Sequence, residues 1–198
     1  MPRLGKARVP TESEQKRLMV VTRAGNHASR NLAILAASYR LGLRAMEIAA
    51  LRVKDVLDDG GRIREECNLS EAMTKGGKPR TVYLTNPGVK QAFRDYLAER
   101  RQSEDILFNV EAPLFKSQKA RHFTPNSMQQ LVARLHARAG IQGGRSHSGR
   151  RWFATELISK GIDLRAVSVL MGHSSVAMTA QYADDNPQRL RRIAAELV

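Results

Sequence analysis

Apolar residues recur at helical spacing along most of this chain, but one internal stretch breaks the period. Leu32, Leu35 and Ala36 give a helix over about 29–40 an apolar face, and comparable patterns return after residue 86. The intervening stretch holds three short segments rich in branched residues, which are typical of strands: residues 53–57, 62–69 and 80–84. Gly-containing turns separate them. The sequence therefore predicts a mainly helical α+β domain with a small three-stranded antiparallel sheet.

Local signals mark the helix boundaries. Thr11 followed by Glu14 is a capping-box pattern, so a helix is expected from there to about Arg23. Pro87 and Pro125 stand at the favoured first position of two further helices. We expect a single domain over 11–198 after a basic, mobile lead-in over 1–10, because no repeat or linker divides the chain. The remaining helices are expected at about 45–51, 86–97, 124–140, 147–161, 163–172, 176–183 and 188–197.

The charge balance points to a polyanionic partner. The 198 residues include 33 Lys and Arg against 19 Asp and Glu, which gives a net charge of +14. Basic side chains gain affinity for nucleic acid by releasing the counterions that phosphates condense. Charge alone leaves a ribosome-associated protein or a merely basic domain open.

Other features exclude several classes of protein. No apolar stretch is long enough to span a membrane, and the first ten residues lack the apolar core of a secretory signal. A single cysteine, Cys67, excludes an internal disulfide and a cysteine-based zinc cluster. The histidines show no metal-ligand spacing. We therefore expect a cytoplasmic protein that uses no metal and no cofactor.

Seven polar residues from separate predicted elements have the chemistry of metal-free phosphoryl transfer. Glu47 follows Arg44 by three residues, and Arg150 follows His147 by the same interval, so each pair shares a helix face. Lys75 lies on a Gly-flanked hairpin loop. The full set is Arg44, Glu47, Lys75, His147, Arg150, His173 and Tyr182.

Each of these residue types has a task in such a reaction. Two guanidinium groups can neutralise the charge that grows on a phosphodiester in the transition state. The phenol of Tyr182 is a weak nucleophile, and the imidazole of His147 can act as its base. Lys75 can give a proton to the departing 5′ oxygen. His173 would donate another hydrogen bond to the phosphate, and Glu47 would hold Arg44 or His147 in place.

Four stretches resemble the motifs of the tyrosine recombinase, or phage integrase, family. YRLGLRAMEIAALRVKDV (39–56) is similar to its first Arg box, and TKGGKPRTVYL (74–84) to its hairpin with a lysine. HSGRRWFATEL (147–157) is similar to its His-x-x-Arg box, and LMGHSSVAMTAQY (170–182) to its Gly-His box and nucleophile. All four occur in the family's order, which makes the combination far more specific than any one motif. The resemblance implies catalytic roles for Arg44, Lys75, His147, Arg150, His173 and Tyr182, with Glu47 as supporting acid.

The chain departs from the family pattern at a few positions. Gly149 stands where Leu is usual before the second Arg, and Arg151 where His is frequent after it. We expect Arg151, Lys78 and Arg80 to contact DNA, and Lys78 is close enough to Lys75 to replace it. Most members also carry a separate DNA-binding domain ahead of this one, so we expect a minimal, catalytic-domain-only recombinase.

The resemblance also implies partners and leaves alternatives. It implies duplex DNA as substrate and a homo-oligomer, a tetramer on two sites, with an accessory DNA-binding protein or partner recombinase as an option. The basic, apolar-striped helix over 188–197 would serve assembly; its arginines are Arg189, Arg191 and Arg192. A DNA-relaxing enzyme of the type IB topoisomerase kind remains open, and so does a non-catalytic DNA-binding regulator.

Overall fold

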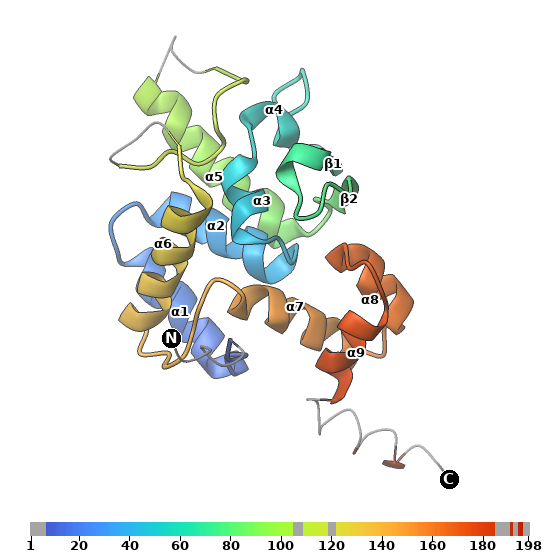
Figure 1. Ribbon diagram of the computed structural model, residues 1–198. Helices are drawn as coiled ribbons and strands as arrows, with labels where there is room; N and C mark the ends of the chain where they lie inside the picture. The colour runs from blue at the N-terminus through green and yellow to red at the C-terminus, as the bar shows by residue number, and fades with distance from the viewer. Residues whose placement is uncertain (1–6, 105–108, 119–121, 185–190, 192–193, 196–198) are drawn as a thin grey trace.

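The computed structural model describes residues 7–104, 109–118, 122–184, 191 and 194–195, and these form a mainly helical domain (Figure 1). The strands are β1 (Glu66–Leu69) and β2 (Arg80–Tyr83), with the short 3₁₀ helix η1 (Glu71–Met73) between them. The α-helices are α1 (Glu12–Arg23), α2 (Ala28–Arg40), α3 (Ala45–Ala50), α4 (Val53–Val56), α5 (Pro87–Glu104), α6 (Pro125–Arg138), α7 (Ser148–Ser159), α8 (Leu164–Met171) and α9 (Ala177–Asp184). The predicted fold class is confirmed.

The capping signals place the helix ends where the sequence predicts them. The Thr11 hydroxyl accepts a hydrogen bond from the Glu14 amide, and the Glu14 carboxylate accepts one from the Thr11 amide. Asp163 caps α8 in the same way through the Ala166 amide. Gly172 ends that helix with a left-handed backbone, φ +58°, which costs glycine little. The helix predicted over 188–197 lies largely outside the described residues.

The prediction of three strands is wrong, because residues 53–56 form a helical turn. The Asp55 carboxylate accepts a hydrogen bond from the Arg52 amide at 2.7 Å and caps this turn. The amides of Val53 and Lys54 donate to carbonyls of residues 112 and 110, far along the chain. Among the described residues the sheet has two antiparallel strands, with Glu66 opposite Tyr83 and Leu69 opposite Arg80.

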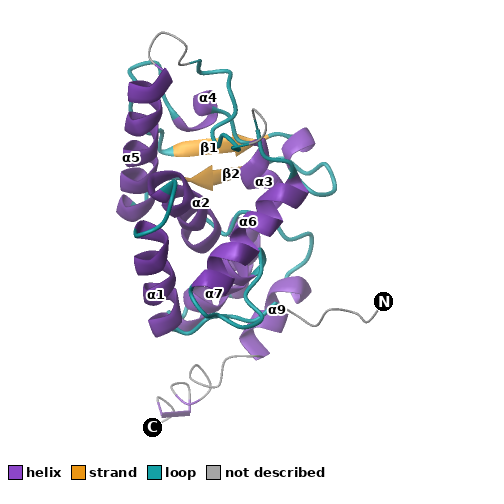
Figure 2. Cartoon of the chain, turned by 90° about the vertical axis from the view of Figure 1, so that its left-hand side faces the viewer, coloured by secondary structure: helices purple, strands orange, loops and turns teal. Residues whose placement is uncertain are grey.

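Helix α2 lies at the centre of the main core and packs against α5 and α7 (Figures 1 and 2). Its side chains Ile34, Leu35 and Tyr39 are fully buried. Helix α7 then runs from this body towards α8 and α9, where a second, smaller cluster of buried residues forms around Ile158 and Met171. The two ends of α7 therefore belong to different hydrophobic clusters.

The ends of the chain are described only in part. Residues 1–6 of the predicted lead-in lie outside the described residues, whereas Arg8 pairs with Glu14 at 2.9 Å and Pro10 is buried. No helix within the described part of the chain has the length and apolar character needed to cross a bilayer.

Candidate active site

Arg44 and Glu47 form the first half of the site, at the start of α3. Arg44 is the N-cap residue, and its amide donates to the Glu47 carboxylate at 2.7 Å. Its guanidinium donates to the other Glu47 oxygen at 2.8 Å and to the Gly172 carbonyl at 3.3 Å. Burial alone would raise the pKa of Glu47, but Arg80, the Arg44 amide and the Arg44 charge together hold it below its ordinary value. Glu47 is therefore a buried carboxylate that fixes Arg44.

Arg150 lies on the first turn of α7 and enters the same cluster from the opposite side. Its side chain is only 3% exposed, and it donates to the Gly42 carbonyl at 2.5 Å and to the Met171 carbonyl. Burial, followed by the charge of Arg44, lowers its pKa to about 9, so the guanidinium still carries its charge at neutral pH. Two neutral backbone acceptors thus hold a cation beside Arg44.

His173 and Tyr182 complete the cluster from the C-terminal helices. Nδ1 of His173 shares a hydrogen bond with the buried hydroxyl of Thr179 at 2.8 Å, which fixes the imidazole ring. The Tyr182 ring stacks on it, with ring centroids 6.0 Å apart and planes 20° apart. Burial and the charges of Arg150, Arg44 and Arg80 lower the pKa of His173 to about 4. At neutral pH His173 is therefore a neutral imidazole beside the phenol.

His147 lies at the rim of the cluster and shares a hollow with Tyr182. This hollow has a volume of about 550 Å³, and Arg145, Arg151 and the polar face of α6 also line it. Burial comes first among the causes that lower the pKa of His147, followed by the charges of Arg150, Arg44 and Lys75. A neutral imidazole near the phenol has the form that a general base requires.

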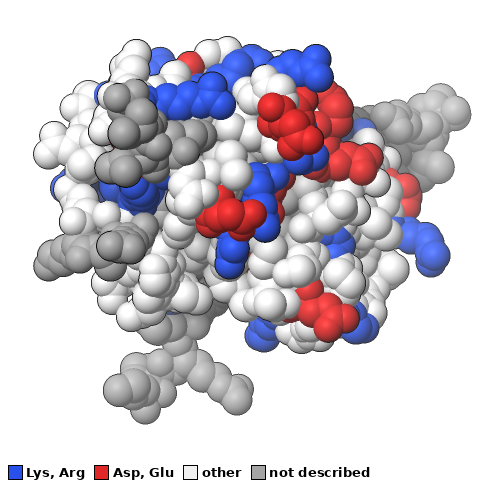
Figure 3. Space-filling model, turned by 90° about the horizontal axis from the view of Figure 1, so that it is seen from above, with Lys and Arg blue, Asp and Glu red and all other residues white. Residues whose placement is uncertain are grey.

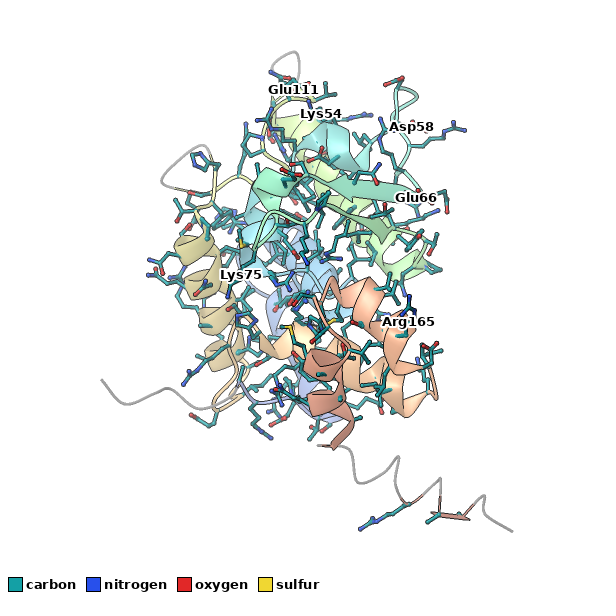
Figure 4. The ribbon with its side chains drawn as sticks, turned by 45° about the vertical axis from the view of Figure 1, so that its right-hand side comes forward. Lys54, Asp58, Glu66, Lys75, Glu111 and Arg165 are labelled. Atoms are coloured by element: carbon teal, nitrogen blue, oxygen red, sulfur yellow. The ribbon has the colours of Figure 1, made fainter. Side chains whose placement is uncertain are left out.

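Lys75 is exposed on the loop between the two strands, as the sequence predicts. Figure 4 shows it between the level of the strand pair and that of the C-terminal helices. Among the causes that lower the pKa of His147, the charge of Lys75 comes last, after burial and the charges of Arg150 and Arg44. Lys78 is exposed on the same loop.

Arg80 does not lie where a DNA-contacting side chain was expected. It points inward from β2, and its guanidinium pairs with Glu47 and with the Leu170 carbonyl, each at 2.9 Å. The sequence analysis expected Arg80 to contact DNA, which requires an exposed side chain. An inward position is compatible with the alternation of β2, but a single arginine gives no sign of its partner.

Two further groups near the site were missed. Thr179, the partner of His173, is a common residue type in a short helix and carries no signal by itself. The amides Asn126, Gln129 and Gln130 line the hollow beside Tyr182 from α6. Their spacing of three and four residues places them on one helix face, which the sequence could have revealed.

Charges elsewhere on the surface are more evenly mixed. Figure 3 shows acidic and basic side chains interspersed on the face seen from above. Arg52 and Lys54, for example, both pair with Glu111, at 3.1 and 2.8 Å. Among the described residues, no three His, Cys, Asp or Glu side chains are grouped as a metal site would require.

Comparison with known proteins identifies the family. The model of the phage integrase family matches residues 8–189. The chain belongs to this family. It is 32% identical over 173 residues to tyrosine recombinase XerC of Pelobacter propionicus, covering 87% of this chain and 53% of that protein. It is 30% identical over 182 residues to tyrosine recombinase XerD of Oceanobacillus iheyensis, covering 91% and 59%. The chain thus spans little more than half the length of these integrase-family relatives.

Solved structures of two recombinases share the fold. The crystal structure of XerA recombinase superimposes with a TM-score of 0.75 at 28% identity, covering 95% of this chain and 64% of that one. A structure of XerH bound to its palindromic difH substrate has a TM-score of 0.71 at 24% identity, covering 96% and 53%.

The two departures from the family motif have structural explanations. Gly149 packs against α2 so closely that a Cβ atom there would come within 2.3 Å of the Ser38 hydroxyl and 2.7 Å of the Tyr39 ring. A larger residue would not fit without displacing α7. Arg151 places its guanidinium carbon 5.3 Å from the Tyr182 ring centroid, within cation–π range. It therefore contacts the predicted nucleophile directly.

Proposed function

We propose that this chain carries the catalytic domain of a site-specific DNA recombinase that cuts and rejoins duplex DNA through a covalent 3′-phosphotyrosine. The observation that carries this proposal is the convergence of Arg44, Arg150, His173 and Tyr182 from three separate parts of the chain. Gly172 and its neighbours join them, since their carbonyls accept from both arginines. The relatives named tyrosine recombinases support the assignment.

The proposed reaction is a transesterification at phosphorus. Tyr182 attacks the phosphate while His147 takes the phenolic proton, and the bond from phosphorus to the 5′ oxygen breaks. Lys75 supplies the proton that this oxygen needs to leave as a hydroxyl. Arg44, Arg150 and His173 bind the non-bridging oxygens, whose charge grows in the transition state. In rejoining, a 5′ hydroxyl attacks the phosphotyrosine and releases Tyr182, so no external energy source is consumed.

The partners follow from the reaction. Exchange between two DNA sites requires two cuts on each duplex, which we assign to a homotetramer, with an accessory DNA-binding protein or partner recombinase as a further component. The net charge of +14 suits a polyanionic substrate. We place the activity in the cytoplasm, the compartment that an enzyme acting on DNA would require in a bacterial cell.

Covalent trapping tests the proposal. The protein is incubated with a pool of nicked duplexes of randomised sequence, and detergent-resistant adducts are separated on a gel. Wild-type protein should trap DNA through the 3′ phosphate, and Tyr182→Phe should trap none while its affinity for duplex DNA changes by less than about twofold.

Tyr83→Phe is the matched control, because this phenol is 48% exposed on β2. It should trap DNA as the wild type does. An adduct formed by Tyr182→Phe would mean that another residue is the nucleophile. Relaxation of supercoiled DNA without exchange between two trapped sites would instead assign a topoisomerase activity.

A further inference from the structure

Arg80 makes contacts that no surface role explains. Its side chain is 9% exposed, and its guanidinium bridges the Glu47 carboxylate and the Leu170 carbonyl. The aliphatic part passes directly under Gly172, where an added Cβ atom would come within 2.3 Å of the Arg80 Cδ. This arginine therefore packs into the centre of the candidate site.

The partners of Arg80 belong to three different parts of that site. Glu47 presents one oxygen to Arg80 at 2.9 Å and the other to Arg44 at 2.8 Å, so the two arginines share one buried carboxylate. Leu170 precedes the Gly172–His173 turn, and Figure 1 shows α8 next to the strand pair. Arg80 itself follows the Lys75 loop on β2. One side chain thus connects the loop, the acid and the turn.

We propose that Arg80 is a positioning residue for strand cleavage, which ties the Gly172–His173 turn and the Glu47–Arg44 pair into one arrangement. The inference rests on the proposed function. A carboxylate shared between two guanidiniums neutralises only part of each, which leaves Arg44 net positive charge for a phosphate. The tie to the Leu170 carbonyl sets where the turn places His173 relative to Arg44.

The conservative variant Arg80→Lys is the most informative test. Lysine keeps the charge beside Glu47 but lacks the planar fork that reaches two acceptors in different directions. We expect the variant to fold, to bind duplex DNA within about threefold of wild type, and to form the covalent adduct roughly 10- to 100-fold more slowly in a single turnover. Arg80→Gln, which lacks the charge as well, should be slower than Arg80→Lys.

Arg62→Gln is the matched control, since Arg62 is an exposed arginine that pairs with Asp58 away from the site. It should leave affinity and rate unchanged. Three results would overturn the inference: an unchanged adduct rate in both folded Arg80 variants, a loss of DNA affinity at an unchanged rate, or a failure of Arg80→Lys to fold. The second would restore a direct DNA contact, and the third would assign a purely structural role.

Failure of the proposed function looks different from failure of this inference. If wild-type protein traps no DNA from the nicked pool, the proposed function fails. If wild-type protein traps DNA and Arg80→Lys traps it at the same rate, only the role of Arg80 fails.

Discussion

Arg150 shows how a buried guanidinium can be held by hydrogen bonds to neutral groups, with no carboxylate of the described residues bonded to it that would neutralise its charge. Its guanidinium donates hydrogen bonds to the carbonyls of Gly42 and Met171, which are neutral dipoles. A carboxylate in their place would satisfy the guanidinium and compete with a phosphate. Glu47 does accept a hydrogen bond from Arg44, but the same carboxylate also accepts one from Arg80. The cluster therefore retains excess positive charge where an anion is expected to bind.

The pH dependence of cleavage should report His147. Its pKa is lowered first by burial and then by neighbouring cations, so the neutral base persists below the ordinary value of about 6.5. Protonation at lower pH removes the base, and the adduct rate should fall only as pH drops below about 6.5. His147→Gln should slow adduct formation by roughly 10²-fold or more, and the fall in rate at low pH should disappear. His122→Gln, which alters an exposed histidine, is the control; an unchanged profile in His147→Gln would assign the base elsewhere.

At the scale of single elements, the absence of a side chain at Gly149 sets the position of α7. Gly149 lets the first turn of α7 approach the Ser38 and Tyr39 side chains of α2 at a distance that no Cβ atom allows. Because Arg150 is the next residue, this contact also sets the depth at which its guanidinium enters the site.

Gly149→Ala should therefore destabilise the protein despite the better helix propensity of alanine. Overpacking of this kind costs about 1–3 kcal/mol, which chemical denaturation can measure. Gly25→Ala is the matched control, because an added Cβ there meets nothing closer than 3.5 Å. Equal stability of the two variants would show that the Ser38 and Tyr39 side chains make room for the added methyl group, and would contradict the prediction.

Elements with local signals were predictable from the sequence, and those that depend on distant partners were not. The caps at Thr11 and Asp163 fixed α1 and α8 because their hydrogen bonds lie within four residues. The segment after Arg52 was mistaken for a strand, since its amides pair with carbonyls near residue 110. The buried position of Arg80 could not be predicted for the same reason, because its partners are 33 and 90 residues away. The motif residues were found because their order along the chain is itself a signal.

At the scale of the whole molecule, the site joins two hydrophobic clusters. Arg44 and Glu47 stand on the main core, whereas His173 and Tyr182 stand on the small cluster formed by α8, α9 and the end of α7. Among the residues that the structure describes, the small cluster contains five buried hydrophobic side chains: Ala154, Ile158, Val167, Met171 and Ala183. So few buried groups indicate a lower free energy of local opening than in the main core.

Amide hydrogen exchange should show this difference directly. We expect the amides of α8 and α9 to exchange markedly faster than those of α2, by a local opening that leaves α2 protected. Met171→Ala should speed exchange in α8 and α9 further, and Leu35→Ala should instead destabilise the main core. Uniform protection across α2, α8 and α9 would show one cooperative unit and contradict the prediction.

The net charge predicts how DNA binding responds to salt. With 33 basic against 19 acidic residues, affinity for duplex DNA should fall steeply between 50 and 200 mM salt, by roughly 10³-fold or more if six phosphates are contacted. A fluorescence titration at several salt concentrations measures the slope. A flat response would contradict a binding mode dominated by phosphate contacts.

The division between the two clusters determines when the proposed cleavage site is complete. Under the proposed mechanism, DNA is cut only while the Tyr182 phenol is aligned with the two arginines. Here Arg44 stands on the main core, whereas His173 and Tyr182 stand on the small cluster, and the hydrogen bonds of Arg80 and Arg150 to the carbonyls of residues 170 and 171 join the two. Under the proposed function, a local opening of the small cluster would separate Tyr182 from Arg44 and interrupt cleavage while the main core stays folded.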